Sequence, residues 1–215
     1  MTATVIAVAQ SKGGAGKTTL AAHLGVAWAT HGRGIAVVDT DPQGSLTEWY
    51  RRRAQRLGTE HTGIGFAAAP GWRAPQEIER QACGRDIVLV DSSPRADEDS
   101  RAAIRCAALV LVPVQPSPVD VWATLPTLEV ARREAVPALL VLNRVPPRAS
   151  LTATMRALLA EYDVGLASIG IGNRIALASA FAEGWGVAEC AAGSSAAAEI
   201  ESLANEVLGL LPRGA

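Results

Sequence analysis

Short apolar runs alternate along the chain with longer stretches in which apolar residues recur at helical spacing. The first run, residues 4–9, is rich in β-branched residues and is typical of a buried strand. Residues 35–39 form a second run of this kind, directly after Gly34. Similar runs recur downstream. The predicted strands are residues 4–9, 35–39, 63–68, 86–90, 109–113, 138–142 and 166–169.

The stretches between these runs predict helices. Residues 18–31 give the clearest signal, because Leu20, Leu24, Ala27 and Trp28 recur at the spacing of one helix face. The predicted helices are residues 18–31, 75–82, 97–106, 118–134, 151–161 and 195–211.

Strands that are apolar throughout and separated by helices indicate a parallel sheet covered on both faces. We therefore expect an α/β fold, a three-layer doubly wound and mostly parallel sheet, formed by residues 1–215 as a single domain. In such sheets, ligands bind beyond the carboxyl ends of the strands. The polar motifs described below all follow predicted strands.

Composition narrows the classes of protein. About half of the 215 residues are hydrophobic (49%), so a large core is available, and the net charge of −1 argues against a generally basic nucleic-acid coat. Neither a signal peptide nor an apolar run of about 20 residues is present, so we expect a cytoplasmic protein. Cys83, Cys106 and Cys190 lie far apart, which favours reduced thiols over a disulfide framework or a metal site.

Residues 11–19 form a glycine-rich stretch between a predicted strand and a predicted helix, the context of a phosphate-binding loop. Glycines let successive N–H groups point at phosphate oxygens, and the following helix adds the positive end of its dipole. Lys17 would bridge the β- and γ-phosphates, Thr18 would bind Mg²⁺, and Thr19 would approach the α-phosphate. The alternative is a strand-to-helix turn without a ligand. The predicted phosphate-binding residues are Lys12, Gly13, Gly14, Ala15, Gly16, Lys17, Thr18 and Thr19.

The use of lysine supports this interpretation. The chain has 18 arginines and only two lysines, Lys12 and Lys17, both inside the glycine-rich loop. A lysine is a compact point charge that fits a narrow phosphate cradle, whereas arginine is a broad planar fork. Ser11 departs from the general motif, which begins with glycine.

Carboxylates end two of the predicted strands. Asp39 and Asp41 are two positions apart in extended chain, so their side chains share a side before Pro42 and Gly44 turn the backbone. A helix cap is the alternative: it would explain one of these aspartates, and it explains both together with Gln43 less well. Asp91 ends a strand in the manner of an acid that holds Mg²⁺ through water.

These motifs together resemble the ParA/MinD family, whose P-loop NTPase fold carries a deviant Walker A loop with an additional lysine at the position of Lys12. The stretch Asp39–Ser45 resembles the family's DxDPQG element, and Asp91–Pro94 is similar to its second acidic element. Val112–Ala123 resembles a PxxPSPxDxWA segment of compact, plasmid-type members. The resemblance extends over about residues 4–211.

The resemblance implies roles for these residues. Lys12 would reach across a homodimer interface to the partner's nucleotide, so the chain would form a sandwich dimer on ATP. Asp41 would position the attacking water. Asn143 would read adenine by its amide, although it is equally typical of a turn after a strand. The implied catalytic residues are Asp41, Lys12 and Lys17, and the implied metal site consists of Thr18, Asp39 and Asp91.

The resemblance also implies a Mg²⁺-dependent ATPase whose ATP-bound dimer binds DNA nonspecifically near the nucleoid. A small DNA-binding or adaptor protein would stimulate hydrolysis and link the dimer to a plasmid, chromosome or protein cargo. Candidate DNA contacts are Arg174, Arg148 and Arg156, although arginines are often solvated helix faces.

Two other functions compete with this one. A MinD-like membrane-associated ATPase would need a basic amphipathic C-terminal helix, but residues 195–211 carry Glu199, Glu201 and Glu206. We therefore expect no membrane partner. A metallocluster reductase with the same loop would need interface cysteines, and Cys106 has no suitable second cysteine. A metabolic P-loop ligase would lack the second acid and the Pro-Gln-Gly element that this chain has at Asp41–Gly44.

Overall fold

The computed structural model describes residues 3–94, 98–147 and 149–211. Its centre is one seven-stranded sheet with the order β3-β2-β4-β1-β5-β6-β7, in which all neighbouring strands are parallel. The strands are β1 (Thr4–Val8), β2 (Ile35–Asp39), β3 (Gly65–Ala68), β4 (Ile87–Asp91), β5 (Leu109–Val114), β6 (Ala138–Leu142) and β7 (Gly165–Leu166).

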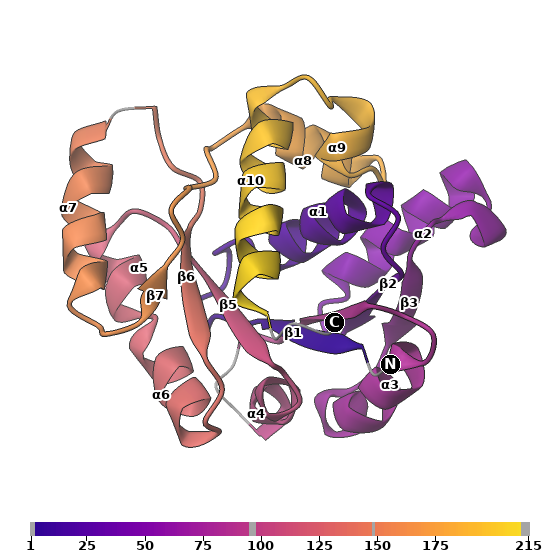
Figure 1. The fold of residues 1–215 in the computed structure, drawn as a ribbon, viewed down its shortest axis with the longest axis horizontal. Coiled ribbons are helices and arrows are strands. Elements are labelled where there is room, and N and C mark those ends of the chain that lie inside the picture. Colours follow the sequence, from indigo (N-terminus) through magenta and orange to yellow (C-terminus); the bar gives the residue numbers. More distant parts are fainter. Residues whose placement is uncertain (1–2, 95–97, 148, 212–215) are drawn as a thin grey trace.

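Helices cover both faces of this sheet, as expected for strands that are apolar on both sides. The helices are α1 (Lys17–Thr30), α2 (Ser45–Leu57), α3 (Ala74–Ala82), α4 (Glu98–Arg105), α5 (Pro118–Trp122), α6 (Leu125–Arg133), α7 (Ala149–Ala160), α8 (Ile175–Ala182), α9 (Val187–Cys190) and α10 (Ser195–Leu210), with 3₁₀ turns η1 (Thr59–His61) and η2 (Gly71–Arg73). One core joins the sheet to α1, α2, α8, α9 and α10, and two others join it to α3–α7 (Figure 1). The predicted three-layer α/β fold is confirmed.

The predicted helix over residues 118–134 is wrong in one respect, because the chain forms two helices, α5 and α6, instead. Pro126 lies near the start of α6 and has no backbone N–H to donate to the preceding turn. The side chain of Ser117 caps α5 by accepting a hydrogen bond from the Asp120 N–H. The helices α2, α8 and α9 were not predicted.

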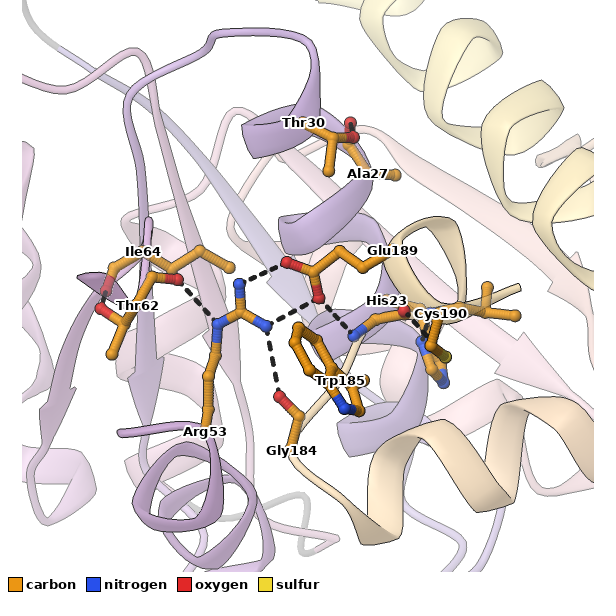
Figure 2. A network of polar contacts seen from close by, with 12 residues as sticks. His23, Ala27, Thr30, Arg53, Thr62, Ile64, Gly184, Trp185, Glu189 and Cys190 are labelled. Atoms are coloured by element: carbon orange, nitrogen blue, oxygen red, sulfur yellow. Dashed lines mark hydrogen bonds and ion pairs between the residues drawn. The ribbon is translucent and has the colours of Figure 1, made fainter. Parts of the chain in front are cut away.

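A buried arginine fixes α2 to the C-terminal part of the chain (Figure 2). The Arg53 side chain is 3% exposed and forms an ion pair with Glu189, with N–O distances of 2.6 and 2.8 Å. Its Nε donates to the Thr62 carbonyl, and Nη1 donates to the Gly184 carbonyl. Each charged group therefore has partners that compensate its removal from water.

His23 makes a second connection, from α1 to the same region (Figure 2). Its Nδ1 accepts a hydrogen bond from the Val187 N–H, which leaves Nε2 to donate to the Leu177 carbonyl. Burial lowers the pKa of His23 to about 4, so the ring is neutral at physiological pH. The helix that follows the phosphate loop is thereby tied to α8 and α9.

We expect Arg53→Ala to lower the free energy of unfolding by about 3–5 kcal/mol, because it leaves the Glu189 carboxylate part-buried and without its ion-pair partner. Arg51 on the same helix is a matched control, since its ion pair with Glu48 is exposed and Arg51→Ala should have little effect. Urea unfolding followed by tryptophan fluorescence measures both. Equal losses in the two variants would contradict the prediction.

Candidate nucleotide site

The predicted phosphate loop lies between β1 and α1, at the carboxyl edge of the central strands. Gly14 and Gly16 have φ values of 80° and 94°, in the left-handed region that favours glycine. Gly13 and Gly14 are exposed. A Cβ on Gly16 would also lie 2.2 Å from Asn143 Nδ2, so neither its backbone nor its surroundings accept a side chain. The loop thus has the backbone geometry and access that a phosphate cradle requires.

Asn143 lies against the loop. It is buried, its Nδ2 donates to the Ala15 carbonyl at 2.8 Å, and its Oδ1 accepts from the Arg144 N–H at 3.0 Å. The side chain therefore supports the loop from the β6 side. Its adenine-reading role stays a prediction.

The other side of the loop is fastened to the segment of residues 115–127. Ser11 Oγ donates to the Ala123 carbonyl at 2.7 Å, and the Ser11 N–H donates to Thr127 Oγ1 at 3.1 Å. Gln115 Nε2 donates to the Gly14 carbonyl at 3.0 Å. These contacts give Ser11 a structural reason to replace the usual glycine. Sequence reasoning assigned no role to Gln115, which stands at a variable position of the Val112–Ala123 segment, or to Thr127, which lies outside every motif.

Lys12 forms an ion pair within its own chain. Its Nζ lies 2.7 Å from Asp120 Oδ2, and the lysine and aspartate side chains are 34% and 7% exposed. Ser117 Oγ donates to the same Asp120 oxygen. Asp120 Oδ1 is buried and has no hydrogen-bond partner within the described residues. The extra lysine of the loop is thus held at the loop edge by a carboxylate from α5.

The acidic motifs meet beside the loop. Asp39 and Asp91 are register partners on β2 and β4, so the ends of these strands bring the two carboxylates together. Asp39 accepts from the Thr47 N–H and hydroxyl at 2.8 and 2.6 Å and from the Asp41 N–H at 3.1 Å. These bonds orient Asp39, while burial raises its pKa.

Asp91 is completely buried, and neither of its oxygens has a hydrogen-bond partner among the residues that the structure describes. Burial raises its pKa to about 7; Asp39 and Asp41 act in the same direction, whereas Thr18 and Lys17 lower it. Burial lowers the pKa of Lys17, against the attraction of Asp91 and Asp41. The structure therefore gathers one buried ammonium group and three carboxylates at the loop.

This donor set fits Mg²⁺ bound together with phosphates. Within the described ranges, no group of three or more His, Cys, Asp or Glu side chains is arranged to hold a metal by itself. Mg²⁺ is usually bound by one or two carboxylates, water and substrate phosphates rather than by a complete protein cage. Thr18 at the start of α1 and the unpartnered oxygens of Asp91 are suitable ligands of this kind, direct or through water.

Two cavities lie at this edge of the sheet. The one on the acidic side has a volume of about 350 Å³ and is lined by Asp39, Asp41 and Thr47 with residues of the β3 end. The other, of about 120 Å³, lies beside Gly16 and Asn143. The smaller cavity therefore adjoins the loop directly, whereas the larger one is lined by the acidic motif after β2 and by none of residues 11–19.

The family model of the CobQ/CobB/MinD/ParA nucleotide binding domain matches residues 6–187. The chain belongs to this family. The matched residues include the loop, both acidic motifs and Asn143.

Individual relatives agree with this assignment. "Maintenance of carboxysome distribution protein A" of Halothiobacillus neapolitanus is 32% identical over 214 residues, covering 94% of this chain and 95% of that protein. The structure of Pyrococcus horikoshii MinD with Mg-ADP aligns with a TM-score of 0.80 at 20% identity, over 95% of this chain and 96% of that one. An ATP complex of Cyanothece McdA aligns with a TM-score of 0.76 at 17% identity, over 98% of each chain. These two structures share the fold of this MinD/ParA domain.

Of the three arginines predicted to contact DNA, two bind partners within this chain and the third lies outside the described residues. Arg174 Nη2 lies 2.5 Å from Glu199 Oε1. Arg156 donates to the carbonyls of Ala167 and Ser168. Arg148 is outside the described residues. DNA contact by these side chains stays a prediction.

No helix in the described part of the chain is long and apolar enough to cross a membrane.

Asp91 should make the stability of the nucleotide-free protein depend on pH. Its pKa is about 7 in the folded protein against an ordinary value of 3.8, so between these values the folded state holds a proton that the unfolded chain releases. The stability from this group is therefore greatest at low pH and falls as pH rises toward 7.

Urea unfolding at several pH values, in EDTA and without nucleotide, measures this effect. The free energy of unfolding of the wild type should fall relative to that of Asp91→Asn as pH rises through this window. Parallel pH profiles of the two proteins would contradict the prediction.

Proposed function

We propose that this chain is a Mg²⁺-dependent ATPase that dimerises on ATP and positions a cargo along DNA. The observation that carries the proposal is the buried ammonium group of Lys17 beside the carboxylates of Asp91 and Asp41, at a glycine loop with exposed backbone. A triphosphate with a divalent cation satisfies both kinds of charge. Family membership supports nucleotide as the ligand.

The chain's own residues divide the work of hydrolysis. The loop N–H groups and Lys17 bind the phosphates, and the Thr47 bonds hold Asp39 beside the metal position. Mg²⁺, when bound by Thr18 and Asp91, supplies charge neutralisation of the phosphate oxygens. Asp41 accepts a hydrogen bond from the Gln43 N–H through Oδ1, which orients the carboxylate that would hold the attacking water.

Dimerisation would change the partner of Lys12. In the single chain its ammonium group is paired with Asp120, so it must leave that carboxylate to reach a nucleotide held by a second copy. The phosphates of ATP would replace the charge that Asp120 provides. A second copy without nucleotide offers no such replacement, so this exchange makes association depend on ATP.

The positioning role rests on the relatives. The Halothiobacillus protein is named for maintaining the distribution of carboxysomes, and the match covers nearly the whole of both chains. We propose that the present protein likewise distributes a cargo through a small DNA-binding or adaptor partner that stimulates hydrolysis, in a cytoplasmic, nucleoid-associated setting. Arg132 and Arg133 are exposed at the end of α6 and add to the candidate DNA contacts.

Trapping the ATP state tests the dimer. Asp41→Ala should bind MgATP without hydrolysing it and elute from size exclusion at twice the monomer mass. Adding Lys12→Ala should return it to the monomer. Asp120→Asn, which releases Lys12 from its ion pair, should lower the ATP concentration needed for dimerisation. A monomer in Asp41→Ala at saturating MgATP would refute the sandwich dimer.

DNA binding needs a separate measurement. An electrophoretic shift of unrelated duplex DNA should appear with Asp41→Ala and MgATP, be absent with ADP, and weaken steeply as salt increases. Without an ATP-dependent shift at low salt, the DNA part of the proposal would have to be abandoned.

A further inference from the structure

Two consecutive carbonyl groups in the middle of the phosphate loop are held by side-chain amides from the ends of neighbouring strands. Gln115, directly after β5, donates from Nε2 to the Gly14 carbonyl at 3.0 Å. Asn143, directly after β6, donates from Nδ2 to the Ala15 carbonyl at 2.8 Å. A carbonyl oxygen can only accept, so each amide presents its NH₂ group to the loop. Two neighbouring peptide groups of the loop are therefore held from outside it.

These contacts also determine where the N–H groups of the same peptides point. The C=O and the N–H of a planar trans peptide group point in opposite directions. The Gly14 carbonyl is turned toward Gln115, so the Ala15 N–H is turned away from it. The Ala15 carbonyl and the Gly16 N–H are related in the same way through Asn143. A phosphate-binding loop uses the backbone N–H groups of this glycine-rich stretch to bind phosphate oxygens.

The peptide between Gly14 and Ala15 needs an external contact, because its own backbone does not fix its orientation. Gly14 is exposed and has a φ of 80°, and glycine adopts positive and negative φ about equally readily. A Cβ at this position would meet no atom within 4 Å, so the surroundings leave room for the peptide to rotate. Within the described ranges, the Gln115 amide is the side-chain group that holds this carbonyl in one orientation.

We propose that Gln115 is a positioning residue for phosphate binding, which directs the Ala15 N–H toward the phosphates by holding the Gly14 carbonyl on the opposite side. The proposal rests on nucleotide binding in the phosphate loop, and Gln115 acts on that binding through the loop. An N–H group that is oriented in advance needs no reorganisation when the ligand binds, which increases affinity. The other contacts of the 115–127 segment act earlier in the loop, at Ser11 and Lys12.

Calorimetric titrations with ADP and with inorganic tripolyphosphate, each with Mg²⁺, test this role. Gln115→Met keeps the approximate length of the side chain but removes its donor. It should weaken the binding of both ligands by the same factor, about 3- to 10-fold, the worth of one hydrogen bond, and Gln115→Ala should give the same loss. If the side chain served packing alone, Gln115→Met would bind both ligands as the wild type does. Gln76→Met, at an exposed position on α3, is the matched control.

NMR of the ligand-free protein detects the orientation of the peptide group. In Gln115→Met the backbone amide resonance of Ala15 should shift, whereas that of Gly16 should move less, because Asn143 still holds its peptide group. The urea midpoint of this variant should equal that of the wild type. A loss of affinity that came with a lowered midpoint and with shifts throughout the spectrum would instead assign Gln115 to the stability of the fold.

Two kinds of failure remain distinguishable. Unchanged affinities in both Gln115 variants, or a loss confined to one of the two ligands, would show that Gln115 does not position the phosphate-binding groups, while the proposed ATPase would stand. If the wild type binds neither ligand, the proposed function itself fails and this inference with it.

Discussion

The site depends on charges that are buried before any ligand arrives. Lys17 and Asp91 lie inside the protein. Burial lowers the pKa of Lys17 and raises that of Asp91, so it disfavours the charged form of each group. Neither oxygen of Asp91 meets the geometry of a hydrogen bond within the described residues, and the nearby Thr18 and Lys17 offset the cost of burial only in part. A polyanion with a divalent cation supplies the missing partners of both groups, so binding recovers free energy that folding alone leaves unrecovered. Such an arrangement is expected of a ligand-binding site, because buried charges that only support the fold would destabilise it without any compensation.

The loop that carries these charges is held from two directions. Asn143 supports it through the Ala15 carbonyl on the β6 side. Gln115 and Thr127 hold its other edge, together with the Lys12–Asp120 ion pair. A rearrangement of the loop on nucleotide binding therefore has to be accommodated by the 115–127 segment, which also exposes the large apolar side chain of Trp122. A nucleotide that moved the loop would therefore also move the surface around α5.

The sequence predicted those elements and motifs well that consist of consecutive residues. The apolar runs predicted the parallel sheet. The polar residues at the ends of β1, β2 and β4 predicted the loop, Asp39 and Asp91 as parts of one site, because parallel strands bring these ends to one edge of the sheet. α2 was missed because its buried face includes Arg53, whose partner Glu189 is 136 residues away. α8 was missed because its residues are apolar on nearly every side, which leaves no periodic pattern.

Partners that are distant in the sequence also explain why the number of arginines overestimates the positive surface charge that is available to attract DNA. The guanidinium groups of Arg51 and Arg52 both bind Glu48 and hold its pKa at about 2, and Arg56 is paired with Glu183. The positive charge of the arginines on α2 is therefore largely neutralised by acidic side chains that lie one turn away or on another helix. Net attraction for DNA has to come either from exposed groups such as Arg132, for which the described residues provide no ion pair, or from the field that two copies create together. In the second case DNA binding would follow dimerisation without any arginine changing its local partner, so the nucleotide dependence of DNA binding would arise from the geometry of the dimer.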